Sequence, residues 1–352
     1  MRKAKKIFVV VLSFLCIILA ASVFVNLANI GNDSPKKDSS SSILTEPVFD
    51  PYEGVSGNRT ILNYDVAEDN LTVSFKVGAE VERVVFSSGN EEYIYEAHQD
   101  VAAAGTIEYT FETPGGKQVE IFGATSFVDN AFFDEKRLTY VSFGEGVVNV
   151  GKYAFHGCRA MRNVFFSETL KSIGYGAFMY VGVSVVDIPD TLTTLGELSF
   201  FQCPNITTIS IGAGVTEIPD KAFLNCLKVS SLTIGENVQK IGYQAFEASK
   251  GLTELVIPDS VKTIGGSAFA NCDSITKLTI GSSVESIGTN AFSSLIKLQN
   301  VICRAENPPS VDYGTFNAWQ SIETISVPNE TAKTAYQAAN GWNEFADKIF
   351  VG

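Results

Sequence analysis

The chain has 352 residues, with 26 Lys and Arg against 39 Asp and Glu, and a formal net charge of −13 at pH 7. An acidic chain without a basic stripe is unsuited to nucleic acid or to anionic lipid, because both are bound through Lys and Arg. Its two histidines, His98 and His156, stand in no metal-binding or catalytic motif, so the composition predicts no enzyme, no cofactor and no metal site.

Residues 1–30 combine a basic start with a long apolar run. Met1 to Lys6 carries the positive charges, and Ile7 to Val25 is almost entirely apolar. Small residues at Ala20 to Ser22 offer a cleavage site for a signal peptide, whereas the same run is just long enough to be kept as a membrane anchor. Both interpretations predict export to the cell surface or the extracellular space, and membrane contact arises through this segment if it is uncleaved. Residues 31–44 are polar and Ser-rich, which predicts a linker.

Residues 45–122 predict a small β domain. Short runs with alternating apolar residues, such as Leu71 to Val77 and Ile107 to Phe111, are separated by Gly, Asn and Pro turns, a spacing typical of a β-sandwich. The final stretch, Gly105 to Gly123, is similar to the last hairpin of immunoglobulin-like modules on bacterial surface proteins. The alternative is that the region serves as an N-terminal cap for the part of the chain after residue 122.

A repeat occupies residues 123–328. One phenylalanine recurs at intervals of 22 to 24 residues, at Phe132, Phe155, Phe178, Phe200, Phe223, Phe246, Phe269, Phe292 and Phe316. A fixed period in this range is the signature of a solenoid, in which each unit buries its apolar side against its neighbours.

Within one unit, Leu252, Leu255 and Ile257 follow the preceding Phe and predict a strand with one buried face. Gly265 then stands where we expect a tight corner, as do Gly242 and Gly288 in the neighbouring units. The fold class is therefore predicted as mainly β, a solenoid of 23-residue units with a parallel strand ladder, preceded by a small β-sandwich-like domain.

The frame Leu-x-x-Leu-x-Ile-Pro, Val-x-x-Ile-Gly, Ala-Phe, best seen in Leu252 to Ser274, resembles the BspA-like (Treponema-type) leucine-rich repeat surface protein family. The resemblance implies adhesion, since members of that family are typically surface proteins that bind host matrix proteins or other microbes. Departures from the family frame are the unit from Phe178 to Phe200, which is one residue short, and Pro219 at a corner.

Residues 329–352 predict a C-terminal cap. Thr331 to Ala339 is expected to form a short helix with Asn329 as N-cap. Trp342, Phe345 and Ile349 are then expected to cover the open end of the core, and the whole segment resembles the usual ending of the same family.

The cysteines of the repeats recur three residues after the Phe, at Cys158, Cys203, Cys226 and Cys272. Cys203 and Cys226 belong to adjacent units, about 4.8 Å apart in a parallel ladder, so a disulfide between them is an alternative. The favoured interpretation is that these residues are buried thiols that act as small apolar side chains. His156, directly after Phe155, is expected to be a solvated loop residue.

The predicted binding surface is the outward face of the strand ladder. Positions eight and ten after the Phe point outward, and their candidate ligand residues are Tyr140, Phe165, Thr208, Ser210, Ser231, Thr233, Glu254, Lys277 and Thr279. Thr and Ser also suit a wet sheet without any ligand, whereas exposed Tyr140 and Phe165 cost solubility. We therefore predict a non-catalytic surface or secreted protein that binds a protein on a host or neighbouring cell. The alternatives are a carbohydrate-binding component and a passive spacer for the N-terminal domain.

Overall fold

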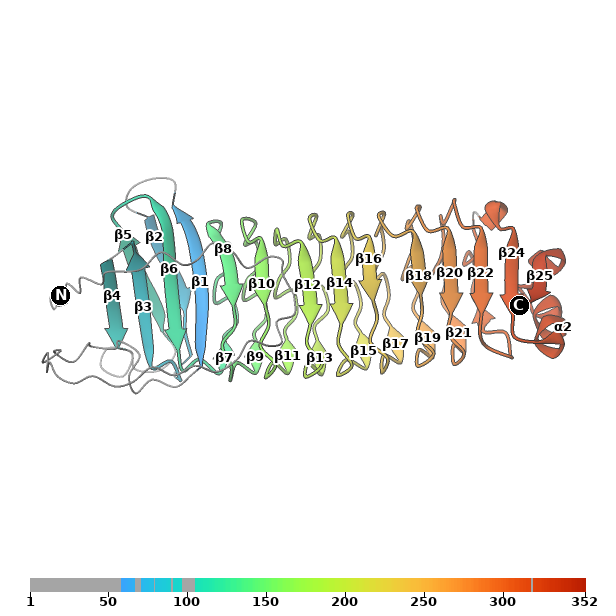
Figure 1. Ribbon diagram of the computed structural model, residues 1–352, viewed down its shortest axis with the longest axis horizontal. Coiled ribbons are helices and arrows are strands. Elements are labelled where there is room, and N and C mark those ends of the chain that lie inside the picture. The colour runs from blue at the N-terminus through green and yellow to red at the C-terminus, as the bar shows by residue number, and fades with distance from the viewer. Residues whose placement is uncertain (1–57, 67–70, 79, 90, 97–104, 318) are drawn as a thin grey trace, which may run out of the picture.

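The computed structural model describes residues 58–66, 71–78, 80–89, 91–96, 105–317 and 319–352. The chain forms a rod, with antiparallel strands at one end, successive coils along its length and short helices at the other end (Figure 1). One continuous cluster of buried apolar side chains extends from Leu62 to Ile349. The predicted signal or anchor, the predicted linker and His98 lie outside the described residues.

The N-terminal end is built from two facing sheets. Strands β1, β6, β3 and β4 lie side by side and antiparallel, and β2 pairs with β5. Phe75 of β2 and Phe111 of β5 each place their ring 6.2 Å from the ring of Phe86 on β3, so aromatic side chains fill the space between the sheets. The strands are β1 (Arg59–Val66), β2 (Leu71–Lys76), β3 (Arg83–Ser88), β4 (Glu91–Glu96), β5 (Thr106–Phe111) and β6 (Gly115–Phe122).

This end is continuous with the coils rather than separated from them. Strand β1 pairs antiparallel with β8 (Leu138–Ser142), the first long strand of the solenoid. The N–H of Lys76 on β2 donates to the carbonyl oxygen of Ala131, and Phe75 stacks on Phe132, the first repeat phenylalanine, at 5.0 Å. The N-terminal sheets thus satisfy backbone groups and cover apolar side chains that would otherwise be exposed at the start of the solenoid.

The long strands from β8 onward run parallel and form a ladder that is hydrogen-bonded in three groups, β8–β10, β12–β14–β16 and β18–β20–β22–β24–β25. Figure 1 shows them side by side along the rod. Successive strands are in register by one repeat, as in Glu254 opposite Lys277 and Leu255 opposite Leu278. This confirms the predicted fold class, a mainly β solenoid of 23-residue units. After β8 the strands are β10 (Asn163–Phe165), β12 (Val185–Ile188), β14 (Thr208–Ile211), β16 (Ser231–Thr233), β18 (Glu254–Val256), β20 (Lys277–Ile280), β22 (Asn300–Cys303), β24 (Thr324–Val327) and β25 (Ile349–Val351).

A second ladder of two-residue strands follows the Val-x-x-Ile part of each repeat. It is parallel as well, as in Lys240 opposite Thr263. The strands are β7 (Ser126–Phe127), β9 (Asn149–Val150), β11 (Ser172–Ile173), β13 (Thr194–Leu195), β15 (Glu217–Ile218), β17 (Lys240–Ile241), β19 (Thr263–Ile264), β21 (Ser286–Ile287) and β23 (Ser310–Val311).

The corner glycines that follow these short strands serve a different purpose from the one expected. We expected Gly265 to supply a turn conformation, but it is not among the residues with positive φ. A Cβ at Gly265 would instead lie 2.7 Å from the carbonyl carbon of Gly242 in the preceding coil. Glycine is required here because two backbones approach closely.

The segment around each repeat Phe forms a third set of bonds between coils. The N–H groups of Tyr153, Phe155 and Gly157 donate to carbonyl oxygens of the next coil, while those of Ala154 and His156 close local turns. Residues two before and two after the Phe adopt positive φ, 55° at Tyr153 and 77° at Gly157. The same two positions are left-handed in coil after coil, often at residues with a Cβ, although this conformation favours glycine.

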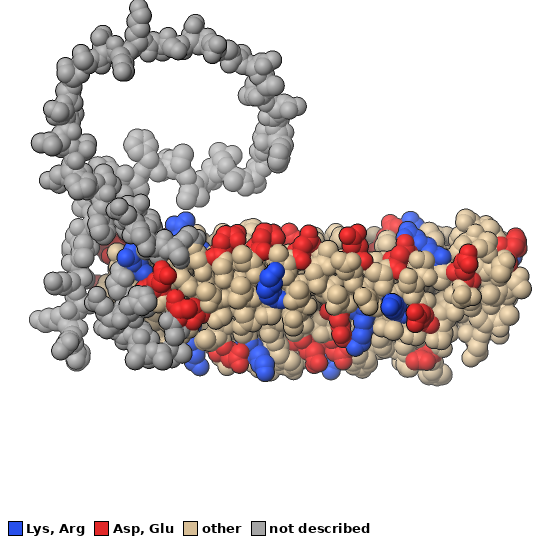
Figure 2. Space-filling view, turned by 90° about the horizontal axis from the view of Figure 1, so that it is seen from below, with Lys and Arg blue, Asp and Glu red and all other residues tan. Residues whose placement is uncertain are grey.

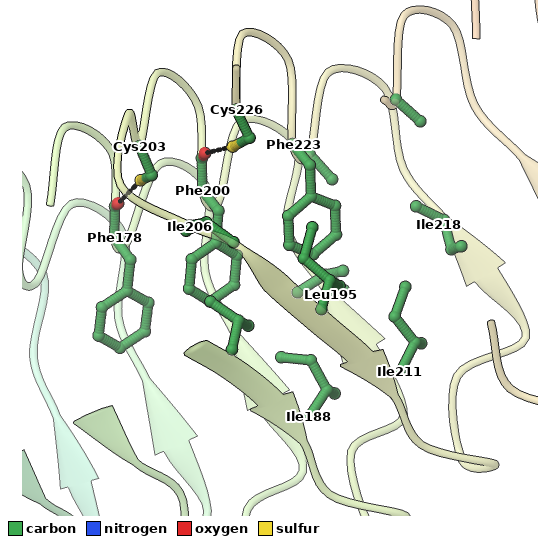
Figure 3. Close-up of a cluster of buried hydrophobic side chains, with 14 of the residues drawn as sticks. Phe178, Ile188, Leu195, Phe200, Cys203, Ile206, Ile211, Ile218, Phe223 and Cys226 are labelled. Carbon is green, nitrogen blue, oxygen red and sulfur yellow. Dashed lines mark hydrogen bonds between the residues drawn. The ribbon is translucent and has the colours of Figure 1, made fainter. Parts of the chain in front are cut away.

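The repeat phenylalanines stack along the axis of the rod. The rings of Phe178 and Phe200 are 5.2 Å apart and those of Phe200 and Phe223 are 5.3 Å apart, with interplanar angles of 6° and 3°. Figure 3 shows these rings pointing into the interior with aliphatic side chains from both ladders beside them. Each ring therefore contacts its counterparts on two sides, which closes the core that a single unit cannot close.

The described cysteines are buried and unbridged. The thiol of Cys203 donates to the carbonyl oxygen of Phe178 at 3.1 Å, and the thiol of Cys226 donates to that of Phe200 at 3.2 Å (Figure 3). These are the thiols for which a disulfide was the alternative. Burial raises the pKa of Cys203 well above that of an ordinary thiol. Both side chains thus hydrogen-bond the coil before them.

The C-terminal end is closed by 3-10 helix η1 (Trp319–Ser321), helix α2 (Glu330–Ala338) and 3-10 helix η2 (Asn343–Lys348). Helix α2 starts one residue before the predicted start, and the side chain of Asn329 accepts the N–H of Ala332 at its N-terminus. Trp342 is fully buried, with its ring 4.8 Å from that of Phe316 and its Nε1–H donating to the carbonyl oxygen of Pro309. The end of the phenylalanine stack is thereby covered.

Candidate binding face

The outward side of the long-strand ladder, here called the strand face, presents alternate residues of each strand. Along β14, Ile209 and Ile211 are buried while Thr208 and Ser210 are partly exposed. Because successive side chains of a strand point to opposite sides, the same alternation repeats along the ladder. The strand face is therefore a regular surface whose chemistry is set by two residues of each coil.

Most of the predicted residues lie on this surface as expected. Phe165 is 53% exposed and is the most open aromatic side chain of the strand face. Four others are exposed or partly exposed hydroxyl residues in adjacent rungs, namely Thr208, Ser210, Ser231 and Thr233. Tyr140, Glu254 and Lys277 are also accessible to solvent.

Thr279 is the exception, since it is 4% exposed and the expectation that it faces water was wrong. Its neighbours in the ladder are Val256 on one side and Ile302 on the other. These branched side chains are larger than Thr and flank it. Thr233, beside the smaller Ser210, stays exposed.

Two residues of the strand face were missed by the sequence analysis. Val185 is 49% exposed, and Asp187 is exposed beside it on β12. They pair with Thr208 and Ser210 in the register. They were missed because the unit that contains them is one residue short, so a count from Phe178 lands on the buried Val186 and Ile188. The interval of 22 residues was the signal that pointed to them.

Aromatic side chains gather at the N-terminal end of the strand face. Tyr140 on β8 and Phe165 on β10 place their rings 5.5 Å apart at an angle of 44°. The exposed Val185 belongs to the next strand along. Exposed apolar groups that lie together in this way are typical of surfaces that bind another molecule.

Charged residues on the strand face pair between coils further along the rod. The Nζ of Lys277 lies 2.7 Å from a carboxylate oxygen of Glu254 in the neighbouring strand. On the short-strand ladder, Lys240 and Glu217 make an equivalent pair at 2.7 Å. Both pairs are half-exposed and contribute little to stability. The Lys277–Glu254 pair leaves this part of the strand face without net charge.

A second aromatic cluster, which was not predicted, lies on the turns that carry the repeat Phe. Phe133, 52% exposed, stacks on His156 with ring centroids 4.6 Å apart. His156 also contacts the rings of Tyr153 and Tyr180, so the expectation of a solvated loop histidine was wrong. Burial in this cluster lowers the pKa of His156 below its ordinary value.

The cavities of the described chain are shallow. One groove of about 400 Å³ crosses four coils on the edge of the phenylalanine turns, lined among others by Leu227, Glu247, Lys250, Asn271, Asp273 and Ile296. Within the described residues, no three His, Cys, Asp or Glu side chains come together as a metal site. The helices in this same part of the chain are all too short or too polar to cross a membrane.

A model of the BspA-type leucine-rich repeat region matches residues 125–253 and 245–341, in six copies. The chain belongs to this family. The match covers well over half of the chain and coincides with the coils of the rod. Members of this family are repeat scaffolds that are usually non-enzymatic, and leucine-rich repeat proteins generally mediate protein interactions. No curated protein matches the chain.

Solved structures of bacterial leucine-rich repeat proteins are similar to this chain. A leucine-rich cell surface protein from Faecalibacterium prausnitzii is 20% identical over 62% of this chain and 67% of its own, with a TM-score of 0.38. The leucine-rich repeat protein of T. pallidum is 20% identical over 52% of this chain and 83% of its own, with a TM-score of 0.40. A leucine-rich repeat protein from Bacteroides ovatus is 17% identical over 66% of this chain and 88% of its own, with a TM-score of 0.32.

Proposed function

We propose that this protein is exported and binds a protein on a host or neighbouring cell through its strand face, without catalysis. The observation that supports this most is the exposed group formed by Tyr140, Phe165 and Val185 on an otherwise regular sheet. Aromatic side chains are enriched at the centres of protein interfaces, where they supply much of the binding energy.

The shape of the strand face supports a macromolecular partner. Strands in a ladder lie about 4.8 Å apart, so the rungs from β8 to β25 extend over roughly 40 Å. Ligand sites for small substrates are concave and enclose most of their ligand. A long, regular sheet with apolar groups at one end suits a protein surface better than it suits a small substrate.

Export is proposed on the N-terminal sequence. The basic residues before Ile7 and the apolar run to Val25 are typical of a segment that directs a chain across or into a membrane. Either a cleaved signal or a retained anchor would present the rod outside the cell. N-terminal sequencing of the exported protein distinguishes these two forms.

Binding assays test the proposed function. The full-length chain is titrated against a panel of extracellular matrix proteins, with a glycan array in parallel. We expect binding to a matrix protein, and we expect the double variant Tyr140→Ala, Phe165→Ala to weaken it by at least about tenfold, since central aromatic residues dominate interfaces.

The other outcomes decide between the alternatives. Binding to glycans that the same variant abolishes would replace the protein partner with a carbohydrate, with Tyr140 and Phe165 as sugar platforms. Partner binding that the double variant leaves intact would place the site away from the strand face. If the chain binds in neither assay, the remaining function is that of a spacer that holds the N-terminal sheets away from the cell.

A further inference from the structure

A small cavity adjoins Phe165 at the N-terminal end of the strand face. Its volume is about 90 Å³, and it is lined by Val164, Phe165, Phe166, Glu168, Asp187 and Pro189. The lining residues include the exposed Phe165 and two acidic residues, Glu168 and Asp187, and no basic residue. The space has room for several water molecules and hence for a small cationic head group.

Asp187 stands out against the other rungs of the ladder. Asp187 lies opposite Ser210, which lies opposite Thr233 in the next strand, and in the strands before β12 the corresponding position is held by Phe165, opposite Ser142. In the paired rungs from β8 to β25, this row holds no other charged residue. Asp187 is therefore the one carboxylate of this row, and it lies near exposed apolar groups.

Neither carboxylate of the cavity is paired with a cation in the described part of the chain. The contrast with an equivalent position is informative. Glu168 stands 13 residues after Phe155, as Asp259 does after Phe246, and Asp259 pairs with Arg304 at 3.3 Å. Glu168 has no such partner in the described residues, and Arg162 donates a guanidinium N–H to the carbonyl oxygen of Arg159.

The surroundings add to the negative potential. Figure 2 shows a row of acidic side chains along one long edge of the rod. Exposed carboxylates occupy the turn after the long strand in three successive coils, at Glu145, Glu168 and Asp190. Like charges along one edge raise the local concentration of a positively charged partner and speed its association.

The geometry points to this cavity as the site that receives an Arg or Lys side chain of the partner protein. A cation over the Phe165 ring is attracted by its π-face, and the carboxylates of Asp187 and Glu168 accept its N–H groups. Arg suits the site better than Lys because its planar fork stacks on a ring and bonds carboxylates at the same time. This inference rests on the proposed function, since it names the chemistry of the partner that the strand face binds.

Two matched peptides test the inference. One is an octapeptide in which Arg alternates with Gly, and its twin carries citrulline, which is neutral and of similar shape, in place of each Arg. Both are titrated against the full-length chain by calorimetry at low and at high salt. We expect the Arg peptide to bind at least about tenfold more tightly than its twin, with a preference that decreases as salt rises.

Variants then locate the effect. The double variant Asp187→Asn, Glu168→Gln should remove the preference for Arg, and Phe165→Ala should weaken it. The repeat supplies matched controls at equivalent positions, Glu236→Gln for Glu168 and Val256→Ala for Phe165, and these should bind as the wild type does. All five side chains replaced in these variants are exposed, and a thermal melt verifies that each variant is folded.

Several results overturn the inference. Equal affinity for the two peptides, or no binding of either, shows that no cation site is present. An equal loss for Glu236→Gln and the cavity variants shows diffuse attraction to the acidic edge instead. These results leave the proposed function standing if Tyr140→Ala, Phe165→Ala still disrupts partner binding. Conversely, the cavity could bind the Arg peptide while the variant Tyr140→Ala, Phe165→Ala still binds the protein partner. That result would reject the proposed function and leave the cation site standing.

Discussion

The interior column of phenylalanines and the outward strand face lie in the same coils but follow different rules. Inside, the side chain barely changes, and the rings of Phe223, Phe246 and Phe269 follow one another at 5.3 Å. Outside, the equivalent rungs change from aromatic at Phe165 to hydroxyl at Thr233. Packing between neighbouring coils constrains the interior, because each unit must fit two others. The strand face has no such neighbour, so its chemistry is free to serve recognition.

The largest effect is expected from a pair of variants that replace one phenylalanine of the interior column and one of the strand face. Phe223→Ala removes a fully buried ring from the stack and should lower the free energy of unfolding by about 3–5 kcal/mol. Phe165→Ala, half-exposed on the strand face, should change it by less than about 0.5 kcal/mol. Urea unfolding followed by circular dichroism measures both. Similar losses for the two variants would show that the strand face is part of the packed structure.

The buried thiols provide a chemical test of the interior. Burial raises the pKa of Cys272 and of Cys303 to about 12, which leaves roughly a thousandfold less thiolate near pH 8 than an ordinary thiol. In the variant Cys16→Ser, the remaining thiols should resist a disulfide reagent until the protein is unfolded. Rapid labelling of the folded protein would mean that the interior opens readily.

The same pKa shift makes stability depend on alkaline pH. Because the folded pKa is above the unfolded one, the contribution of the neutral thiol is complete below the ordinary thiol pKa and is lost as pH rises toward about 12. Cys272→Ala should reduce the alkaline loss of stability, as measured by melts across this range. An unchanged pH profile would contradict the burial of this thiol.

Close contact between coils is tested at a corner glycine. Gly265→Ala places a Cβ 2.7 Å from backbone of the preceding coil and should destabilise the protein by about 1–3 kcal/mol, as overpacking does. Gly116, which has open space around it, is the control, and Gly116→Ala should have little effect. If the two variants melt at the same temperature, the coils do not approach each other as closely as this contact requires.

The smallest effect is expected at the exposed ion pair. Lys277→Glu places a like charge beside Glu254 in the adjacent strand and should cost less than about 1 kcal/mol, because both side chains are half-exposed. Adding salt should reduce this cost, since salt screens exposed charges. A large loss that salt does not change would show that Lys277 has a structural role in the ladder.

The sequence was sufficient for the ladder, because the period of the Phe residues and the apolar residues between them determine which side of each strand is buried. It was not sufficient where neighbouring coils interact. Thr279 is covered by side chains from the rungs beside it, and Gly265 is needed because of a backbone in another coil. Neither the cover over Thr279 nor the backbone contact at Gly265 can be predicted from the residue pattern within a single repeat.

The candidate site was predictable in part for the same reason. The positions of Tyr140 and Phe165 follow from the alternation of side chains along a strand. Asp187 was missed because its unit is one residue short, so the count from the preceding Phe is off by one residue. The cluster around His156 escaped prediction because its rings come from turns with positive φ, where the chain has no regular spacing of apolar residues.

The central claim is that the strand face, rather than the turns, binds the partner, and two phenylalanines test it most directly. Phe165 on the strand face and Phe133 on the turns are exposed to nearly the same extent, 53% and 52%. The affinity of Phe165→Ala and of Phe133→Ala for the matrix protein that the wild type binds is measured side by side. The account predicts that Phe165→Ala weakens binding by about tenfold or more, as loss of a central aromatic does, while Phe133→Ala binds like the wild type. Loss of binding in Phe133→Ala with full binding in Phe165→Ala would contradict it.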